Sequence, residues 1–177
     1  PSCHSLNCPL CHRHNPHLPL LSLVPKPPHQ ELPTATTKHV NTRVAAARLA
    51  SDSTCQTRSA ADRGKHLFRI SGLVQELARE LAVAESLDNG KPIKESRDVD
   101  VPLVAAWFFY YAGWADKLDH AGVGANPQAL GVAAQIIPWN FQLLMLAWTI
   151  APAPAAGTAV VLTPTGPHWR TPLLLAA

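Results

Sequence analysis

The feature that most constrains the fold of this chain is a long tract without charge, because residues 121–169 contain no Asp, Glu, Lys or Arg. Two short apolar runs in this tract, at 130–137 and 159–162, predict buried strands, and the segment 141–156 between them suits a helix. Strand, helix and strand in this order form a βαβ unit, whose two strands pair in parallel through a right-handed crossover. Parallel strands are buried on both faces, which explains why the tract lacks charge.

A membrane span is the alternative for residues 141–163, because this segment is uncharged and long enough to cross a bilayer. Pro152, Pro154 and Gly157 interrupt the segment, however, and no basic cluster flanks it to set its orientation in a membrane. The sequence therefore favours a buried parallel sheet, and we expect no membrane partner.

Two long helices are predicted before the sheet. The first covers residues 60–87, and Ser59 and Asp62 form a capping pair at its start. Residues 88–92 end it, because Gly90 permits a left-handed C-cap and the following proline cannot continue a helix. Apolar residues recur along this helix at steps of three and four, which indicates one buried face: Leu67, Ile70, Val74, Leu77, Leu81 and Ala84.

The second long helix is predicted over residues 98–119, with a broad apolar face that needs packing partners on more than one side. Pro102 is tolerated only in its first turn, because proline has no backbone N–H. A shorter helix rich in Ala and Arg is expected at 40–50. The predicted fold class is α/β, with a partial Rossmann-like parallel sheet that follows two long helices and a proline-rich leader.

The leader is set apart by its composition. Residues 1–33 hold eight of the 17 prolines, five of the nine histidines and three of the four cysteines. Proline interrupts both helices and strands, so we expect residues 1–39 to be disordered or irregular. Residues 40–177 are then expected to form the folded part of the chain.

A cysteine and histidine cluster in the leader leaves several interpretations open. Cys8, Cys11 and His12 fit the C-x-x-C-H pattern of haem attachment. Cys3, His14 and His17 could instead join Cys8 and Cys11 around zinc. A low-complexity leader without metal is the interpretation that we favour. The alternative function is a non-catalytic zinc-binding or interaction module that uses this cluster.

Charge and cysteine usage exclude other classes of protein. The formal net charge is only +3, and no basic stripe with interleaved aromatic residues indicates nucleic-acid binding. No signal peptide is recognisable, and four unevenly spaced cysteines do not form a secreted disulfide framework. We therefore expect a cytoplasmic protein. Because the sequence begins at Pro1 rather than Met, we interpret it as a fragment, a processed form or an incomplete reading frame.

Four segments carry recognisable motifs: ESLDNGKPIKES at 85–96, YYAGWADKLD at 110–119, QIIPWNFQLLMLAW at 135–148 and IAPAPAAGTAVVLTP at 150–164. The first two resemble the segments that follow the first long helix of aldehyde dehydrogenases. The last two are similar to the strand, Pro-Trp-Asn-Phe turn, helix and second strand of that family's cofactor domain. The resemblance covers residues 59–164, with a weaker trace from 40. It implies that residues 40–177 are part of that family's N-terminal, cofactor-binding domain.

The resemblance implies NAD(P)-dependent oxidation of an aldehyde to a carboxylic acid. In the family, a cysteine thiolate attacks the aldehyde, hydride passes to the nicotinamide, and a water activated by a glutamate hydrolyses the thioester. The side-chain amide of the Asn in Pro-Trp-Asn-Phe, here Asn140, is the family's donor to the developing oxyanion. An ordinary turn residue is the alternative role for Asn140, since Asn is common in turns.

The resemblance also implies a cofactor cleft, lined here by Ile136, Ile137, Pro138, Trp139 and Thr163. For the two isoleucines, burial in the strand core is the alternative. The expected ligands are NAD or NADP and a small aldehyde, and a homo-oligomer is the expected assembly.

Several positions depart from the family pattern. The family's second strand ends in Lys-Pro-Ser/Ala-Glu, whereas Thr163 and Gly166 stand here in place of the Lys and Glu that hold the adenosine ribose. Family members usually have Pro at the position of Gln142 and Lys at the position of Thr149. The family's nucleophilic Cys and general-base Glu follow this region, whereas Cys55 and the three leader cysteines precede Asn140. We therefore expect no turnover from this chain alone.

Overall fold

The computed structural model describes residues 17–19, 31–33, 35–122, 124, 127–164 and 170–176. Its elements, in chain order, are the strands β1 (His17–Pro19) and β2 (Glu31–Pro33), the helix α1 (Thr37–Ala50), the π-helix η1 (Ser51–Cys55), the helices α2 (Ala60–Glu76), α3 (Ala78–Asn89) and α4 (Ile93–Glu95), the π-helix η2 (Ser96–Asp100), the helix α5 (Val101–Trp114), the 3-10 helix η3 (Leu118–His120), the strand β3 (Val132–Ile136), the helices α6 (Gln142–Ile150) and α7 (Pro152–Ala155), the strand β4 (Ala159–Thr163) and the helix α8 (Arg170–Ala176).

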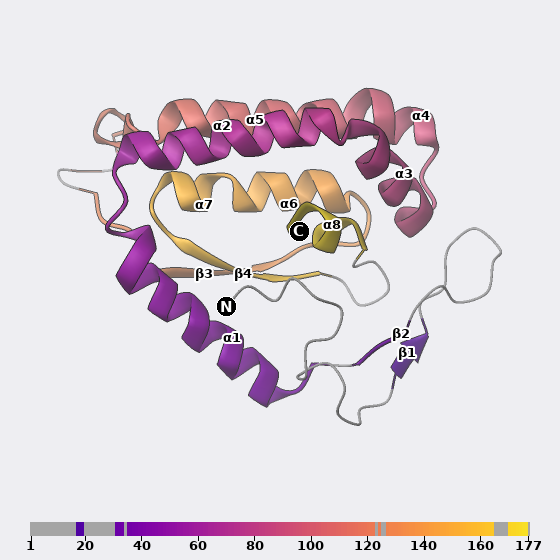
Figure 1. Ribbon diagram of the computed structural model, residues 1–177, viewed down its shortest axis with the longest axis horizontal. Helices are drawn as coiled ribbons and strands as arrows, with labels where there is room; N and C mark the ends of the chain where they lie inside the picture. The colour runs from indigo at the N-terminus through magenta and orange to yellow at the C-terminus, as the bar shows by residue number, and fades with distance from the viewer. Residues whose placement is uncertain are drawn as a thin grey trace.

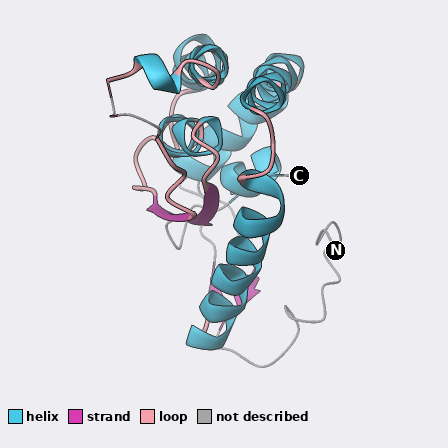
Figure 2. Ribbon diagram, turned by 90° about the vertical axis from the view of Figure 1, so that its left-hand side faces the viewer, coloured by secondary structure: helices cyan, strands magenta, loops and turns pink. Residues whose placement is uncertain are grey.

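The elements stack in layers (Figure 1). Helices α2 and α5 run side by side at one edge of the molecule, and α6 and α7 lie between this pair and the sheet of β3 and β4. Helix α1 contacts the sheet and extends away from the stack (Figure 2). The sheet is therefore held among helices, as in other α/β folds.

The predicted βαβ unit is confirmed. Strands β3 and β4 pair in parallel, with Val132 opposite Ala159 and Ile136 opposite Thr163. Helices α6 and α7 connect them, and Gly157 follows α7 with a left-handed φ of 76°. The break between α6 and α7 falls just before Pro152, which has no N–H to continue the first helix. Among the described residues, no helix is both long and apolar enough to cross a bilayer.

The main core lies where α2, α5 and α6 meet. Its largest fully buried side chains there are Leu67, Val74, Val104, Phe108 and Leu143. Two of these belong to the predicted stripe of the first long helix, so the expected buried face is confirmed where α2 packs against α5.

Helices α2 and α5 approach each other closely at Gly64. A Cβ built on this glycine would lie 3.0 Å from the carbonyl oxygen of Ala112 and 3.7 Å from the Cβ of Ala115. A side chain larger than that of glycine would therefore crowd the backbone of α5 at this position.

The single helix predicted over 60–87 is wrong, because two helices occupy this segment. The chain turns at Leu77, whose φ of −93° and ψ of 14° lie outside the helical range, and α3 begins at the next residue. No Gly or Pro marks the turn. It lets α3 pack against η2 and α8 while α2 stays on α5, so tertiary packing overrides the local helical pattern.

The helix predicted over 98–119 ends earlier, at Trp114, and begins with a widened turn. The N–H of Val101 donates to the carbonyl of Ser96, five residues back, in η2. Pro102 follows directly and has no N–H to donate to the carbonyl four residues before it. The π-helix thus lies where the regular helical ladder cannot be completed.

The leader expected to be irregular contains two short strands. β1 and β2 pair antiparallel, with His17 opposite Pro33, and α1 begins at Thr37 rather than at 40. Residues 1–16, 20–30 and 34 of the predicted leader, which include its three cysteines, lie outside the described residues. Helix α8 was not predicted.

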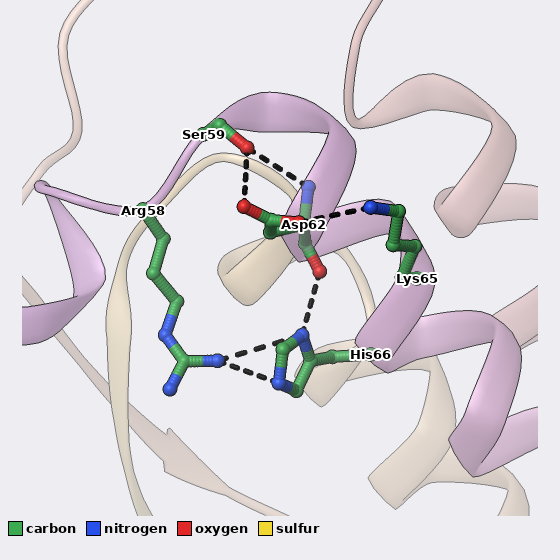
Figure 3. A network of polar contacts seen from close by, with 5 residues as sticks. All are labelled: Arg58, Ser59, Asp62, Lys65 and His66. Carbon is green, nitrogen blue, oxygen red and sulfur yellow. Dashed lines mark hydrogen bonds and ion pairs between the residues drawn. The ribbon is translucent and has the colours of Figure 1, made fainter.

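The capping pair at the start of α2 is confirmed (Figure 3). The N–H of Asp62 donates to the Ser59 hydroxyl at 3.1 Å, and this hydroxyl donates to the Asp62 carboxylate at 2.7 Å. The hydrogen bond from Ser59, followed by that from Lys65, lowers the pKa of Asp62. An Arg58 nitrogen lies 2.6 Å from Nε2 of His66, so Nε2 accepts, and Nδ1 carries the proton that is donated to the Asp62 carbonyl.

Arg63, the residue after Asp62, connects three segments of the chain. Its guanidinium donates to the carbonyls of Ala155 at 3.0 Å, Arg58 at 2.9 Å and Ala115 at 3.5 Å. Ala155 ends α7 and Ala115 is the C-cap of α5, so the cation lies at two helix C-termini, where the helix dipole favours positive charge.

Candidate functional site

The turn between β3 and α6 carries the predicted oxyanion donor. Asn140 lies two residues before the first residue of α6, and its side chain is exposed. Its backbone carbonyl accepts a hydrogen bond of 3.0 Å from the side-chain amide of Asn89. The side-chain amide of Asn140 itself forms no hydrogen bond with any described residue. This amide is thus free to meet a ligand beyond the carboxyl end of β3, where open α/β sheets bind their ligands.

The ends of the two strands bring three of the predicted cofactor residues together. Ile136 pairs with Thr163, and the N–H of Ile137 donates to the Thr163 carbonyl at 3.3 Å. The Ile136 side chain is 81% exposed and that of Thr163 is exposed as well. Ile137 is only 1% exposed, so its side chain packs in the core, as the alternative for this residue predicted.

The other two predicted cofactor residues follow in the turn. Pro138 is exposed, and Trp139 is 63% exposed. Four predicted cofactor side chains, those of Ile136, Pro138, Trp139 and Thr163, are therefore accessible at the same end of the sheet as Asn140.

The corner between α3 and α4 supports this turn, and no local sequence pattern indicates this contact. Gly90 turns the chain with a left-handed φ of 70°. On either side of it, Asn89 donates to the Asn140 carbonyl, and the Lys91 ammonium lies 3.8 Å from the centre of the Phe141 ring. Such a cation over an aromatic face is attracted by the ring's quadrupole.

Two buried carboxylates lie behind this corner. The Lys91 ammonium donates to Asp100 at 2.6 Å, and the side chains are only 9% and 2% exposed. Asn89 also donates to Glu85 at 3.4 Å, and Glu85 is completely buried. Burial raises the pKa of Glu85, and the nearby positive charge of Lys91 opposes this increase.

The first residue of α6 is unusual for its position. Gln142 is fully buried, and among the described residues neither its amide nitrogen nor its amide oxygen has a hydrogen-bond partner. A buried amide without partners is unfavourable by about 1–3 kcal/mol. This site is one at which the resemblance predicts proline.

Cys55 lies away from the turn that carries Asn140. Its backbone carbonyl is 3.5 Å from the position of a Cβ built on Gly157, which comes just before the start of β4. Cys55 is therefore at the amino end of the strands, whereas Asn140 is at the carboxyl end. No group of three potential metal ligands occurs within the described ranges, and the Cys3, Cys8, Cys11 and His12 cluster lies outside them.

Sequence comparison places these features in a family. The model of the aldehyde dehydrogenase family matches residues 18–177. The mitochondrial aldehyde dehydrogenase family 2 member B4 of Arabidopsis thaliana is 43% identical over 132 residues, which are 70% of this chain and 24% of that protein. The match therefore begins before residue 40, where the trace of the resemblance starts, and the chain spans about a quarter of the relative's length.

Comparison with solved structures agrees. The aldehyde dehydrogenase KauB from Pseudomonas aeruginosa superimposes with a TM-score of 0.82 at 33% identity, covering 91% of this chain and 34% of that one. PnpE, from Pseudomonas sp. WBC-3, was solved in complex with nicotinamide adenine dinucleotide and gives a TM-score of 0.83 at 33% identity, with the same coverage. The fold is thus Rossmann-like, and this chain belongs to the aldehyde dehydrogenase family.

Proposed function

We propose that this chain supplies the oxyanion donor and part of the cofactor cleft for NAD(P)-dependent oxidation of an aldehyde to a carboxylic acid. The observation that carries the proposal is the placement of Asn140. Its amide is exposed and free of hydrogen bonds to described residues, at the carboxyl end of a parallel strand and just before a helix.

The chemistry of an amide suits this role. When a nucleophile adds to an aldehyde carbonyl, negative charge develops on the oxygen, and a donor fixed in place beforehand stabilises that charge. The Asn140 amide donates without carrying a charge of its own. The N-terminus of α6 follows closely, and its helix dipole favours the same negative charge.

The accessible residues around the turn suit a nicotinamide cofactor. Ile136 and Trp139 offer exposed apolar surface to a flat ring, and the Thr163 hydroxyl can form a hydrogen bond with a ribose. Thr163 brings no cation, so we expect weaker binding than a lysine at this position would give. The bound cofactor would accept the hydride, while Asn140 stabilises the oxyanion and Ile137 contributes to the core beneath the cleft.

We expect the chain alone to show no turnover. The one cysteine among the described residues, Cys55, lies at the opposite end of the strands from Asn140, and an oxyanion donor without a nucleophile leaves little activity. A cytoplasmic location, a small-molecule aldehyde as the substrate and a homo-oligomer remain predictions, and the Arabidopsis relative is named mitochondrial.

A fluorescence titration with NAD and NADP tests the cleft. The sequence contains five tryptophans, and Trp139 is the one in the turn. We expect saturable quenching that is lost in Trp139→Phe and kept in the matched control Trp114→Phe, because Trp114 ends α5 far from the turn. The variant Thr163→Lys should bind more tightly. A flat response in both the native chain and Thr163→Lys, or quenching unchanged in Trp139→Phe, would contradict the proposal.

A further inference from the structure

The corner between α3 and α4 holds the peptide after Asn140 from two directions. Asn89 donates to the Asn140 carbonyl at 3.0 Å, and the Lys91 ammonium covers the Phe141 ring at 3.8 Å. These two groups come from residues on either side of Gly90, whose left-handed backbone lets both side chains face the turn. One corner of the chain therefore fixes the backbone on which the Asn140 amide is mounted.

Both holding groups are themselves fixed. Lys91 is buried in an ion pair of 2.6 Å with Asp100, which leaves its ammonium little freedom to leave the ring. The Asn89 amide is oriented by a second acceptor, since it also donates to the buried Glu85 at 3.4 Å. Catalytic groups keep their geometry only when the residues behind them are locked in this way.

We propose that Asn89 and Lys91 are positioning residues for Asn140, acting on its carbonyl and on the ring of the next residue rather than on any ligand. The inference rests on the proposed function, because it matters only if the Asn140 amide is an oxyanion donor. It also gives a physical role to the segment ESLDNGKP at 85–92, which carries the resemblance but lies about fifty residues before the turn.

Backbone dynamics measured by NMR test the proposal without cofactor or turnover. Labelling with 15N-asparagine gives signals from only six asparagines, and Asn140 is one of them. In the native chain we expect an order parameter near 0.85 for the backbone N–H of Asn140. In Asn89→Ala we expect this order parameter to fall below about 0.6. The chemical shifts of the Asn140 side-chain amide should also differ between Asn89→Ala and the native chain.

Three further variants separate positioning from general stability. Asn41→Ala removes an exposed asparagine from α1 and should leave the Asn140 signals unchanged. Asn89→Gln keeps an N–H donor and should restore part of the lost order. If Asn89→Ala does not fold, the double variant Lys91→Met with Asp100→Asn removes the cation together with the charge of its ion-pair partner, and it should lower the same order parameter.

The outcomes are distinct. A loss of order confined to the turn supports the proposal. An unchanged Asn140 order parameter in the folded variants, or a loss spread evenly over the chain, overturns it. The cofactor titration is independent: if NAD(P) fails to bind the native chain while the turn loosens in Asn89→Ala, the proposed function fails and the positioning contact stands.

Discussion

Two glycines of α2 provide a test of how closely α2 approaches α5. A Gly to Ala change inside a helix stabilises it by about 1 kcal/mol, because alanine loses less backbone entropy on folding. At Gly72 no atom lies within 4 Å of the new Cβ, so Gly72→Ala should gain this full amount. At Gly64 the Cβ would meet the Ala112 carbonyl oxygen at 3.0 Å, closer than ordinary van der Waals contact. Overpacking of this kind is unfavourable by about 1–3 kcal/mol.

The two effects at Gly64 oppose each other, and the steric effect should be equal or larger. We expect Gly64→Ala to change stability by between about 0 and −2 kcal/mol, while Gly72→Ala adds about 1 kcal/mol. Each kcal/mol corresponds to a change in Tm of about 2–4 °C for a chain of this size. Thermal unfolding followed by circular dichroism measures both variants. A Gly64→Ala variant as stable as Gly72→Ala would refute the close crossing of the two helices.

Three further variants follow from the same structure. Gln142→Pro should raise Tm, because it removes a buried amide without partners, worth about 1–3 kcal/mol, and proline suits the first position of a helix; a lower Tm would show that the amide has a partner. Ser59→Ala should destabilise the chain by about 1 kcal/mol through the lost cap of α2, and urea unfolding would measure this. Glu85→Gln tests the raised pKa of Glu85. A carboxyl whose pKa is higher in the folded state than its ordinary value of 4.5 contributes stability below pH 4.5, and this contribution is lost as the pH rises through the raised pKa. Urea midpoints should therefore show Glu85→Gln to be more stable than the native chain at neutral pH, with the difference shrinking toward pH 4; the opposite trend would mean that Lys91 outweighs burial.

Periodicity and breaker residues predicted where most helices and both parallel strands lie. Burial patterns extend over many residues, and Ser59, Gly90 and Gly157 mark ends by a local backbone requirement. The turn at Leu77 was missed because no residue there disfavours a helix, and only the packing of α3 elsewhere makes the chain bend. The widened turn before Pro102 was missed although proline does disfavour a helix. The prediction placed Pro102 in the first turn, where proline is tolerated, whereas the helical segment starts before this turn.

In the candidate site, too, local motifs could be predicted from the sequence, whereas contacts between distant residues could not. Asn140 was predicted because its neighbours form a contiguous motif with a known chemistry. Its contact with Asn89 joins residues 51 positions apart, and no local pattern encodes such a pairing. The exposure of Ile136 and the burial of Ile137 also required the structure, since an apolar residue at the end of a strand can face either side.

The guanidinium of Arg63 has a consequence for how the chain opens. Because one side chain bonds to the end of α7, the end of α5 and the residue before the cap of α2, none of these three ends can fray without breaking a bond shared with the others. Amides at the three ends should therefore exchange with solvent deuterium at similar free energies of opening, as a single cooperative unit. Residues distant along the chain would thus share one protection factor.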